Sequence, residues 1–158
     1  MSYRILAINP GSTSTKIAVY DNEKQILVKS IDHKVEDLEK YDKVQEFTER
    51  YKEDGIIWFI EACDLNVFAI RRAMWQMEEA GWFQYVKGFL IGRPLCFGQE
   101  MMGLDQYQAV LAVAGEKNVP VIMDMDLGHL APMMPIVTGS LAEVRVCDND
   151  ITIRYDYR

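Results

Sequence analysis

Three polar side chains of different chemistry each follow a short apolar run that is predicted to be a strand: Glu61, Arg93 and His129. If those strands are parallel, their carboxyl ends meet at one edge of a sheet, where the loops of open α/β folds usually carry the chemistry. A glutamate that accepts a hydrogen bond from the Nδ1–H of a histidine fixes the tautomer and leaves Nε2 to act as a base. The sequence therefore predicts Glu61 and His129 as catalytic partners, with Arg93 beside them as a substrate-binding group.

The same three residues also have a purely structural interpretation. Glu61 would then form an ion pair with Arg93, and His129 would satisfy carbonyl groups of its own loop. Gly128 before the histidine and Pro132 after it indicate a tight, rigid loop. Such a loop favours the catalytic interpretation.

The elements that must position these residues alternate between strand and helix. Strands are predicted over 56–60, 87–91 and 119–125, and helices over 66–80 and 104–114, each helix being followed by a glycine. A β-α-β-α-β order predicts neighbouring parallel strands joined by right-handed crossovers.

Strand-rich segments flank this unit on both sides. A β-meander precedes it, with strands predicted over 4–8, 15–20 and 25–31. An amphipathic helix with one narrow apolar stripe is predicted over 35–51. A β-hairpin is predicted after the unit, with strands over 141–146 and 151–155 around the turn 148–150. The predicted fold is therefore α/β: a meander and a helix, then the β-α-β-α-β unit, then a hairpin.

Composition is that of an ordinary globular protein, with 158 residues of which 49% are hydrophobic and 26% charged. The formal net charge of −7 argues against nucleic acid and against anionic membrane surfaces as partners. No apolar run reaches the roughly 18–20 residues that a membrane span requires, and the first residues do not resemble a secretory signal. We expect a cytoplasmic protein.

Few side chains of this sequence suit a metal ion. The three cysteines, Cys63, Cys96 and Cys147, are far apart and form no C-x-x-C pair, and there are two histidines. Buried, reduced thiols are expected. We predict no metal site and no cofactor, apart from the nucleotide alternative given below.

Residues from about 45 to 158 resemble the C-terminal domain of the LD-carboxypeptidases, also called muramoyltetrapeptide carboxypeptidases, a family that includes microcin-immunity peptidases. The matching segments are WFIEACD at 58–64, IRRAMWQMEEAG at 70–81, KGFLIGRP at 87–94 and DLGHLAPMMPIVTGSLAEV at 126–144. The resemblance implies a Ser-Glu-His triad in which Glu61 and His129 are the acid and the base. It also implies peptidoglycan recycling, with a cell-wall tetrapeptide losing its terminal D-alanine.

The serine of that triad is expected in an upstream α/β domain, at a glycine-rich turn between a strand and a helix. Nothing in residues 1–54 resembles this turn, because Ser12 and Ser14 lead into another predicted strand. Loss of a triad nucleophile typically lowers turnover on the order of a millionfold. We therefore expect the chain alone to be nearly inert, and to take a muropeptide-type substrate only when the missing domain is supplied.

Residues 1–45 resemble a second family, the acid kinases, and within it butyrate kinase. The motif N-x-G-S-x-S-x-K falls on Asn9, Gly11, Ser12, Ser14 and Lys16. Backbone N–H groups and hydroxyls of such a hairpin can cradle phosphate, and the lysine adds charge. The resemblance implies ATP, magnesium and a short-chain carboxylate. A β-meander whose turn is merely rich in small polar residues is the structural alternative.

The chain is thus predicted to be a composite of two segments, 1–45 and 46–158. Three functions are open: a peptidase C-terminal domain, a carboxylate kinase remnant, and a non-catalytic scaffold or interaction module. The third could form a homodimer through an apolar face that a missing domain would otherwise cover.

Overall fold

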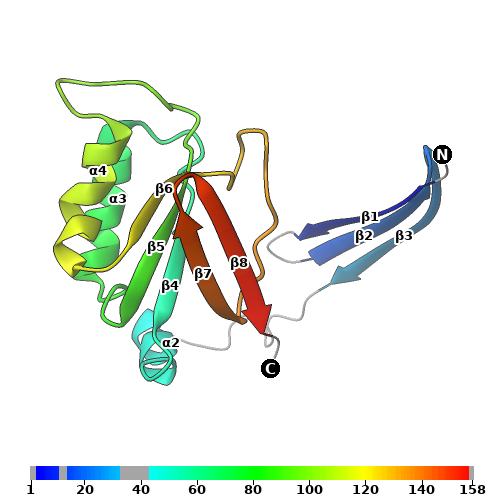
Figure 1. Ribbon diagram of the computed structural model, residues 1–158, viewed down its shortest axis with the longest axis horizontal. Helices are drawn as coiled ribbons and strands as arrows, with labels where there is room; N and C mark the ends of the chain where they lie inside the picture. Colours follow the sequence, from blue (N-terminus) through cyan, green and yellow to red (C-terminus); the bar gives the residue numbers. More distant parts are fainter. Residues whose placement is uncertain (1–2, 11–13, 33–42, 157–158) are drawn as a thin grey trace. The chain divides into compact units, whose positions relative to one another are not determined.

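The computed structural model describes residues 3–10, 14–32 and 43–156 of the chain. Contacts divide it into two compact units, Met1–Lys43 and Val44–Arg158, which are described separately (Figure 1). None of the described helices is long and apolar enough to cross a membrane.

The first unit is an antiparallel meander in the order β1-β2-β3, as the sequence predicts. Its strands are β1 (Arg4–Pro10), β2 (Ser14–Asp21) and β3 (Lys24–Asp32). Asn22, with φ 55°, turns the chain between β2 and β3, and its side chain accepts a hydrogen bond from the Tyr3 N–H at 3.1 Å. Asn22 therefore determines where the chain turns after β2, and it also ties the start of β1 to this turn.

Every residue of β3 is exposed, and its apolar residues Ile26, Leu27, Val28 and Ile31 are 40–55% accessible to solvent. The sheet of the first unit consequently has no apolar core of its own within the described residues. A three-stranded sheet usually needs a packed face to be stable alone.

The second unit begins with helix α2 (Val44–Arg50). The part of the predicted helix from residue 35 to 42 lies outside the described residues. Helix α2 is tied to the rest of the unit, because the Gln45 amide donates to the Ala80 carbonyl at 2.6 Å and the Tyr85 hydroxyl donates to Glu49 at 2.8 Å.

Three parallel strands in the order β4-β5-β6 form the centre of the second unit, which confirms the predicted β-α-β-α-β arrangement. They are β4 (Ile56–Ile60), β5 (Val86–Gly92) and β6 (Val121–Met125). Strand β6 begins two residues later than the sequence predicts. Pro120 lacks an N–H for the ladder, although its carbonyl still accepts from the Phe89 N–H at 2.9 Å.

The two crossover helices are α3 (Val67–Glu79) and α4 (Gln106–Ala114), the latter continued by the short 3-10 turn Gly115–Lys117. Asn66 caps α3 as predicted, accepting from the Ala69 N–H at 3.0 Å. Helix α4 starts two residues later than predicted because Asp105 forms a capping box with Gln108.

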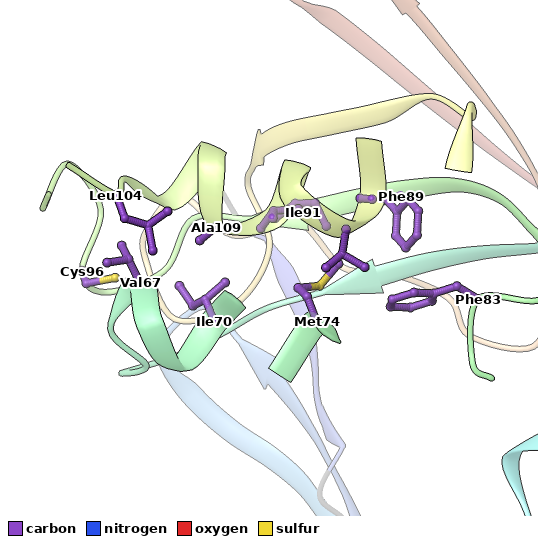
Figure 2. Packing of buried hydrophobic residues seen from close by; sticks show 12 residues of the cluster. Val67, Ile70, Met74, Phe83, Phe89, Ile91, Cys96, Leu104 and Ala109 are labelled. Atoms are coloured by element: carbon purple, nitrogen blue, oxygen red, sulfur yellow. The ribbon is translucent and has the colours of Figure 1, made fainter. Parts of the chain in front are cut away.

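The main core lies between these helices and one face of the sheet (Figure 2). Phe89 is fully buried, and its ring meets that of Phe83 edge to face at 4.9 Å. Met74 of α3 is buried beside them. Burial of each large apolar side chain contributes about 1.5–3 kcal/mol, so this layer holds the strand ends in place.

The predicted hairpin is present and covers the opposite face of the sheet, so the second unit has three layers (Figure 1). Its strands, β7 (Leu141–Cys147) and β8 (Asp150–Asp156), are joined by a two-residue turn. Val144, Ile151 and Ile153 pack against a second cluster formed by Leu90, Met125 and Leu127. Strand β5 is thus buried on both sides.

Candidate functional site

Glu61 follows directly on the last residue of β4 and meets the loop that follows β6. Its Oε2 lies 3.0 Å from Nδ1 of His129, and its Oε1 accepts the Cys63 backbone N–H at 2.7 Å. The glutamate side chain is 17% exposed and the imidazole 60%. Because a carboxylate only accepts hydrogen bonds, Nδ1 would be the protonated nitrogen of a neutral ring, which would leave Nε2 unprotonated.

Two glycines provide the space for the Glu61 side chain. A Cβ built on Gly128 would lie 1.9 Å from Glu61 Cγ, and φ at Gly128 is +96°. A Cβ on Gly92 would lie 2.6 Å from the Leu127 carbonyl and 3.2 Å from Glu61 Cγ. Any other residue at Gly128 would collide with the carboxylate stem and strain the backbone.

A backbone turn at Cys63 completes the environment of the carboxylate. Cys63 has φ of +46°, an uncommon value for a residue with a side chain. In this conformation its N–H donates to Glu61, while its carbonyl accepts from the Leu95 N–H. The site thus uses local backbone strain to fix one oxygen of Glu61.

Arg93 holds the loop that carries His129. Its Nη2 donates to Asp126 Oδ1 at 2.6 Å and to the Pro132 carbonyl at 3.1 Å, so it links the two ends of the loop. The Met134 N–H also donates to the Asp126 carbonyl at 2.7 Å. The alternative in which Arg93 pairs with Glu61 is wrong, because the guanidinium pairs with Asp126 instead.

Arg93 retains unused donor capacity. Its Nε is buried, and within the described residues that atom has no hydrogen-bond partner. A substrate-binding role for Arg93 stays a prediction. In the structure Arg93 joins the two ends of the loop 126–132, and it lies at the same edge of the sheet as Glu61 and His129.

An apolar cavity of about 180 Å³ lies between α3, α4 and the ends of the three strands. Glu61 and Asp124 are its charged lining residues. Where Asp124 borders the cavity, the Tyr107 hydroxyl donates to its Oδ2 at 2.6 Å. This hydrogen bond raises the pKa of Tyr107. The cavity and this pair were not predicted from the sequence, because no periodicity signals either of them.

No group of three or more histidine, cysteine or acidic side chains is arranged to hold a metal ion in the part of the chain that the structure describes. Cys63, Cys96 and Cys147 are free thiols; Cys96 is buried, but the expected burial is wrong for Cys63, which is half-buried, and for Cys147, which is exposed.

The predicted phosphate motif falls on the hairpin between β1 and β2. Asn9 and Lys16 are opposite one another in the strand register. Ser14 is half-buried and Lys16 exposed, whereas Gly11 and Ser12 lie outside the described residues. The motif therefore stays a prediction.

Comparison with known proteins gives two separate likenesses. A family model described as the LD-carboxypeptidase C-terminal domain matches residues 38–144, which is most of the chain. Butyrate kinase 2 of Clostridium acetobutylicum is 42% identical over 67 residues, covering 42% of this chain and 18% of that protein. A probable butyrate kinase of Bacteroides thetaiotaomicron is 63% identical over 41 residues, covering 26% of this chain and 12% of that protein.

A probable butyrate kinase of Thermotoga maritima is 34% identical over 99 residues, covering 58% of this chain. The chain spans 28% of that relative and smaller shares of the two others. No solved structure matches the chain.

Proposed function

The chain belongs to the LD-carboxypeptidase C-terminal domain family over residues 38–144, and from that premise we propose that it contributes the acid and the base of a Ser-Glu-His peptidase triad. Glu61 is the acid and His129 the base. The observation that carries the proposal is the 3.0 Å contact between Glu61 Oε2 and His129 Nδ1. The glycine at position 128 supports it, because any side chain there would collide with Glu61.

In this mechanism His129 Nε2 takes the proton of a serine hydroxyl as the serine oxygen attacks the carbonyl carbon of an L-D peptide bond. The imidazolium is stabilised by Glu61 and then gives its proton to the leaving amine of D-alanine. Water, activated by the same nitrogen, releases the acyl group from the serine. Glu61 stays ionised throughout and keeps the ring oriented.

The serine must come from outside the second unit. Ser140 is the one serine in residues 44–158 of the sequence, and its hydroxyl donates to the Val137 carbonyl at 3.1 Å in a loop turn. We propose that a catalytic domain with the nucleophile docks on the rim of Glu61 and His129. The substrate class is a cell-wall tetrapeptide, whose terminal carboxylate the guanidinium of Arg93 would attract.

The test supplies the nucleophile in trans. The serine-bearing N-terminal domain of an LD-carboxypeptidase, deprived of its own C-terminal domain, is mixed with this chain, and D-alanine release from a muropeptide is measured. Release is expected from the mixture and not from either part. His129→Gln and Glu61→Gln should each abolish it, whereas Glu143→Gln, an exposed carboxylate on β7, should not. Confirmed association without release would contradict the proposal.

The first unit supports a second candidate function, because 41 residues of the chain are 63% identical to a probable butyrate kinase. We propose that Asn9, Gly11, Ser12, Ser14 and Lys16 bind the phosphates of ATP with magnesium. Millimolar Mg-ATP should then raise the melting temperature. Lys16→Ala should remove that rise, and Lys29→Ala, an exposed lysine of β3, should keep it. A melting temperature that does not respond to Mg-ATP would end this idea.

A further inference from the structure

The outer side of α3 carries a charge pattern that is symmetric about one exposed tryptophan. Arg71 and Arg72 precede Trp75 by four and three residues, and Glu78 and Glu79 follow it by three and four. With a rise of about 1.5 Å per residue, the members of both pairs lie about 4.5 and 6 Å along the helix axis from Trp75. The basic end and the acidic end of the pattern are thus equally distant from its centre.

These five side chains share one face of the helix. Successive residues are offset by about 100°, so all five fall within an arc of roughly 120° centred on Trp75. They line one surface groove with Phe68 of α3 and with Ala112, Val113 and Glu116. Trp75, 60% exposed, places an apolar ring at the centre of the charge pattern, and Phe68, 42% exposed, lies seven residues earlier on the same face.

We propose that this face of α3 binds the same face of a second copy of the chain, with the two helices antiparallel across a two-fold axis at Trp75. Antiparallel packing brings the two arginines of one copy level with the two glutamates of the other, at both ends of the contact. The two Trp75 rings meet at the axis and bury each other's apolar surface. A two-fold contact uses the same patch on both copies, as a self-complementary pattern requires.

The charges favour antiparallel over parallel packing of the two α3 helices, and they favour a second copy of the chain as the partner. A parallel arrangement would set Arg71 and Arg72 against themselves and the glutamates against themselves, which is unfavourable. The whole chain carries a net charge of −7 and repels its own copies at long range. A contact between copies therefore needs locally balanced charge, and the α3 face supplies it.

Most of these charges remain available for a partner. In the described residues, Arg71, Arg72 and Glu79 take part in no salt bridge, while Glu78 pairs with Lys117 through Oε1. The face is made of the outer side of α3 and does not include Glu61 or His129. The inference is therefore independent of the peptidase proposal.

Two charge-reversed chains test the contact. R71E/R72E makes the α3 face acidic at both ends, and E78R/E79R makes it basic at both ends. Sedimentation velocity at about 0.15 M ionic strength should show the unmodified chain as a dimer and each variant alone as a monomer. An equimolar mixture of the two variants should form a heterodimer, identified by its mass in native mass spectrometry.

Matched controls separate the α3 face from general charge effects. R145E/R154E changes the net charge by the same amount as R71E/R72E on exposed positions of β7 and β8, and it should leave the dimer intact. Trp75→Ala should weaken dimerisation about tenfold or more, as removal of a central aromatic usually does. The pair R71E and E79R repeats the mixing experiment without touching the Glu78–Lys117 contact, in case E78R/E79R fails to fold.

Three results would overturn the proposal. The unmodified chain could be monomeric over the whole micromolar range. Both variants could remain dimeric, which would place the contact on another surface. Finally, folded variants, as judged by circular dichroism, could fail to associate with each other when mixed.

Discussion

The two units of the chain differ in how their strands are supported. In the second unit, β5 is buried between a helical layer and a hairpin, and its neighbours hold Glu61 and His129 in contact. In the first unit, every residue of β3 is exposed. The two predicted sites therefore differ in their support: Glu61 and His129 rest on a packed core, whereas the predicted phosphate hairpin belongs to a sheet without one in the described residues.

The largest expected difference between the units comes from removing an apolar side chain in each. Phe89→Ala should lower the free energy of unfolding by about 3–5 kcal/mol, because it empties the centre of the main core. Leu27→Ala, at an exposed position of β3, should change it by no more than about 0.5 kcal/mol. Urea titration followed by tryptophan fluorescence reports the second unit, since all three tryptophans lie there, and far-ultraviolet circular dichroism in the same titration reports both units. Equal losses for the two variants would abolish the contrast.

The next effect concerns the space that Gly128 provides. Gly128→Ala should destabilise the second unit by about 1–3 kcal/mol through backbone strain, and its Cβ should also displace Glu61 from His129. Gly139→Ala is the matched control, because Gly139 has φ of +74° but a Cβ placed there would meet nothing within 4 Å. Thermal unfolding measures the strain in both variants. If Gly128→Ala cost no more than Gly139→Ala, the steric account of the site would fail.

Removal of the Arg93 guanidinium should loosen the loop that carries His129. Arg93→Ala leaves Asp126 and the Pro132 carbonyl without their donor, and the loss of such a partner costs about 1–3 kcal/mol. Limited proteolysis should then cut within residues 126–134 faster than in the parent chain. Arg154→Ala, an exposed arginine of β8, should not alter the cleavage rate of this loop. Unchanged cleavage in Arg93→Ala would show that the guanidinium has no role in holding the loop.

The smallest effect is a pH dependence at the margin of the cavity. The hydrogen bond to Asp124 raises the pKa of Tyr107 in the folded state, since the neutral hydroxyl is the donor. Its contribution to stability is therefore complete below the unfolded value of about 10, and it is lost as the pH rises through the higher folded value. Tyr107→Phe should flatten the alkaline end of the stability profile. Denaturant unfolding of the parent chain and of Tyr107→Phe across the alkaline range checks this, and identical pH profiles for the two would contradict it.

The sequence was sufficient for the order of the elements, because apolar runs and caps are local signals. Asn66 and Gly81 delimit α3 as expected, and the strands of both antiparallel segments appear where alternation and turns predict them. The placement of Glu61 and His129 on one edge follows from the parallel direction of neighbouring strands, because their carboxyl ends then meet at the same edge.

Other features of the site depend on distances that no pattern encodes. The choice of Asp126 over Glu61 as partner of Arg93 is settled by side-chain reach. The contacts of Gly92 and Gly128 with Glu61 arise between residues more than thirty positions apart in the sequence. In the sequence, Gly128 after the last strand of the unit is the one indication of this close packing. The glycine alone does not indicate that Glu61 is the side chain that occupies the space.

The proposed triad depends on Glu61 holding a neutral His129 as the Nδ1–H tautomer, with Nε2 left as the base. Long-range ¹H–¹⁵N correlation NMR on a His33→Asn chain observes His129 alone, because the sequence has two histidines. At a pH where the ring is neutral, the account predicts a protonated Nδ1 and a bare Nε2, and loss of this preference in Glu61→Gln. A protonated Nε2 in the parent chain, or identical spectra for the two chains, would contradict it.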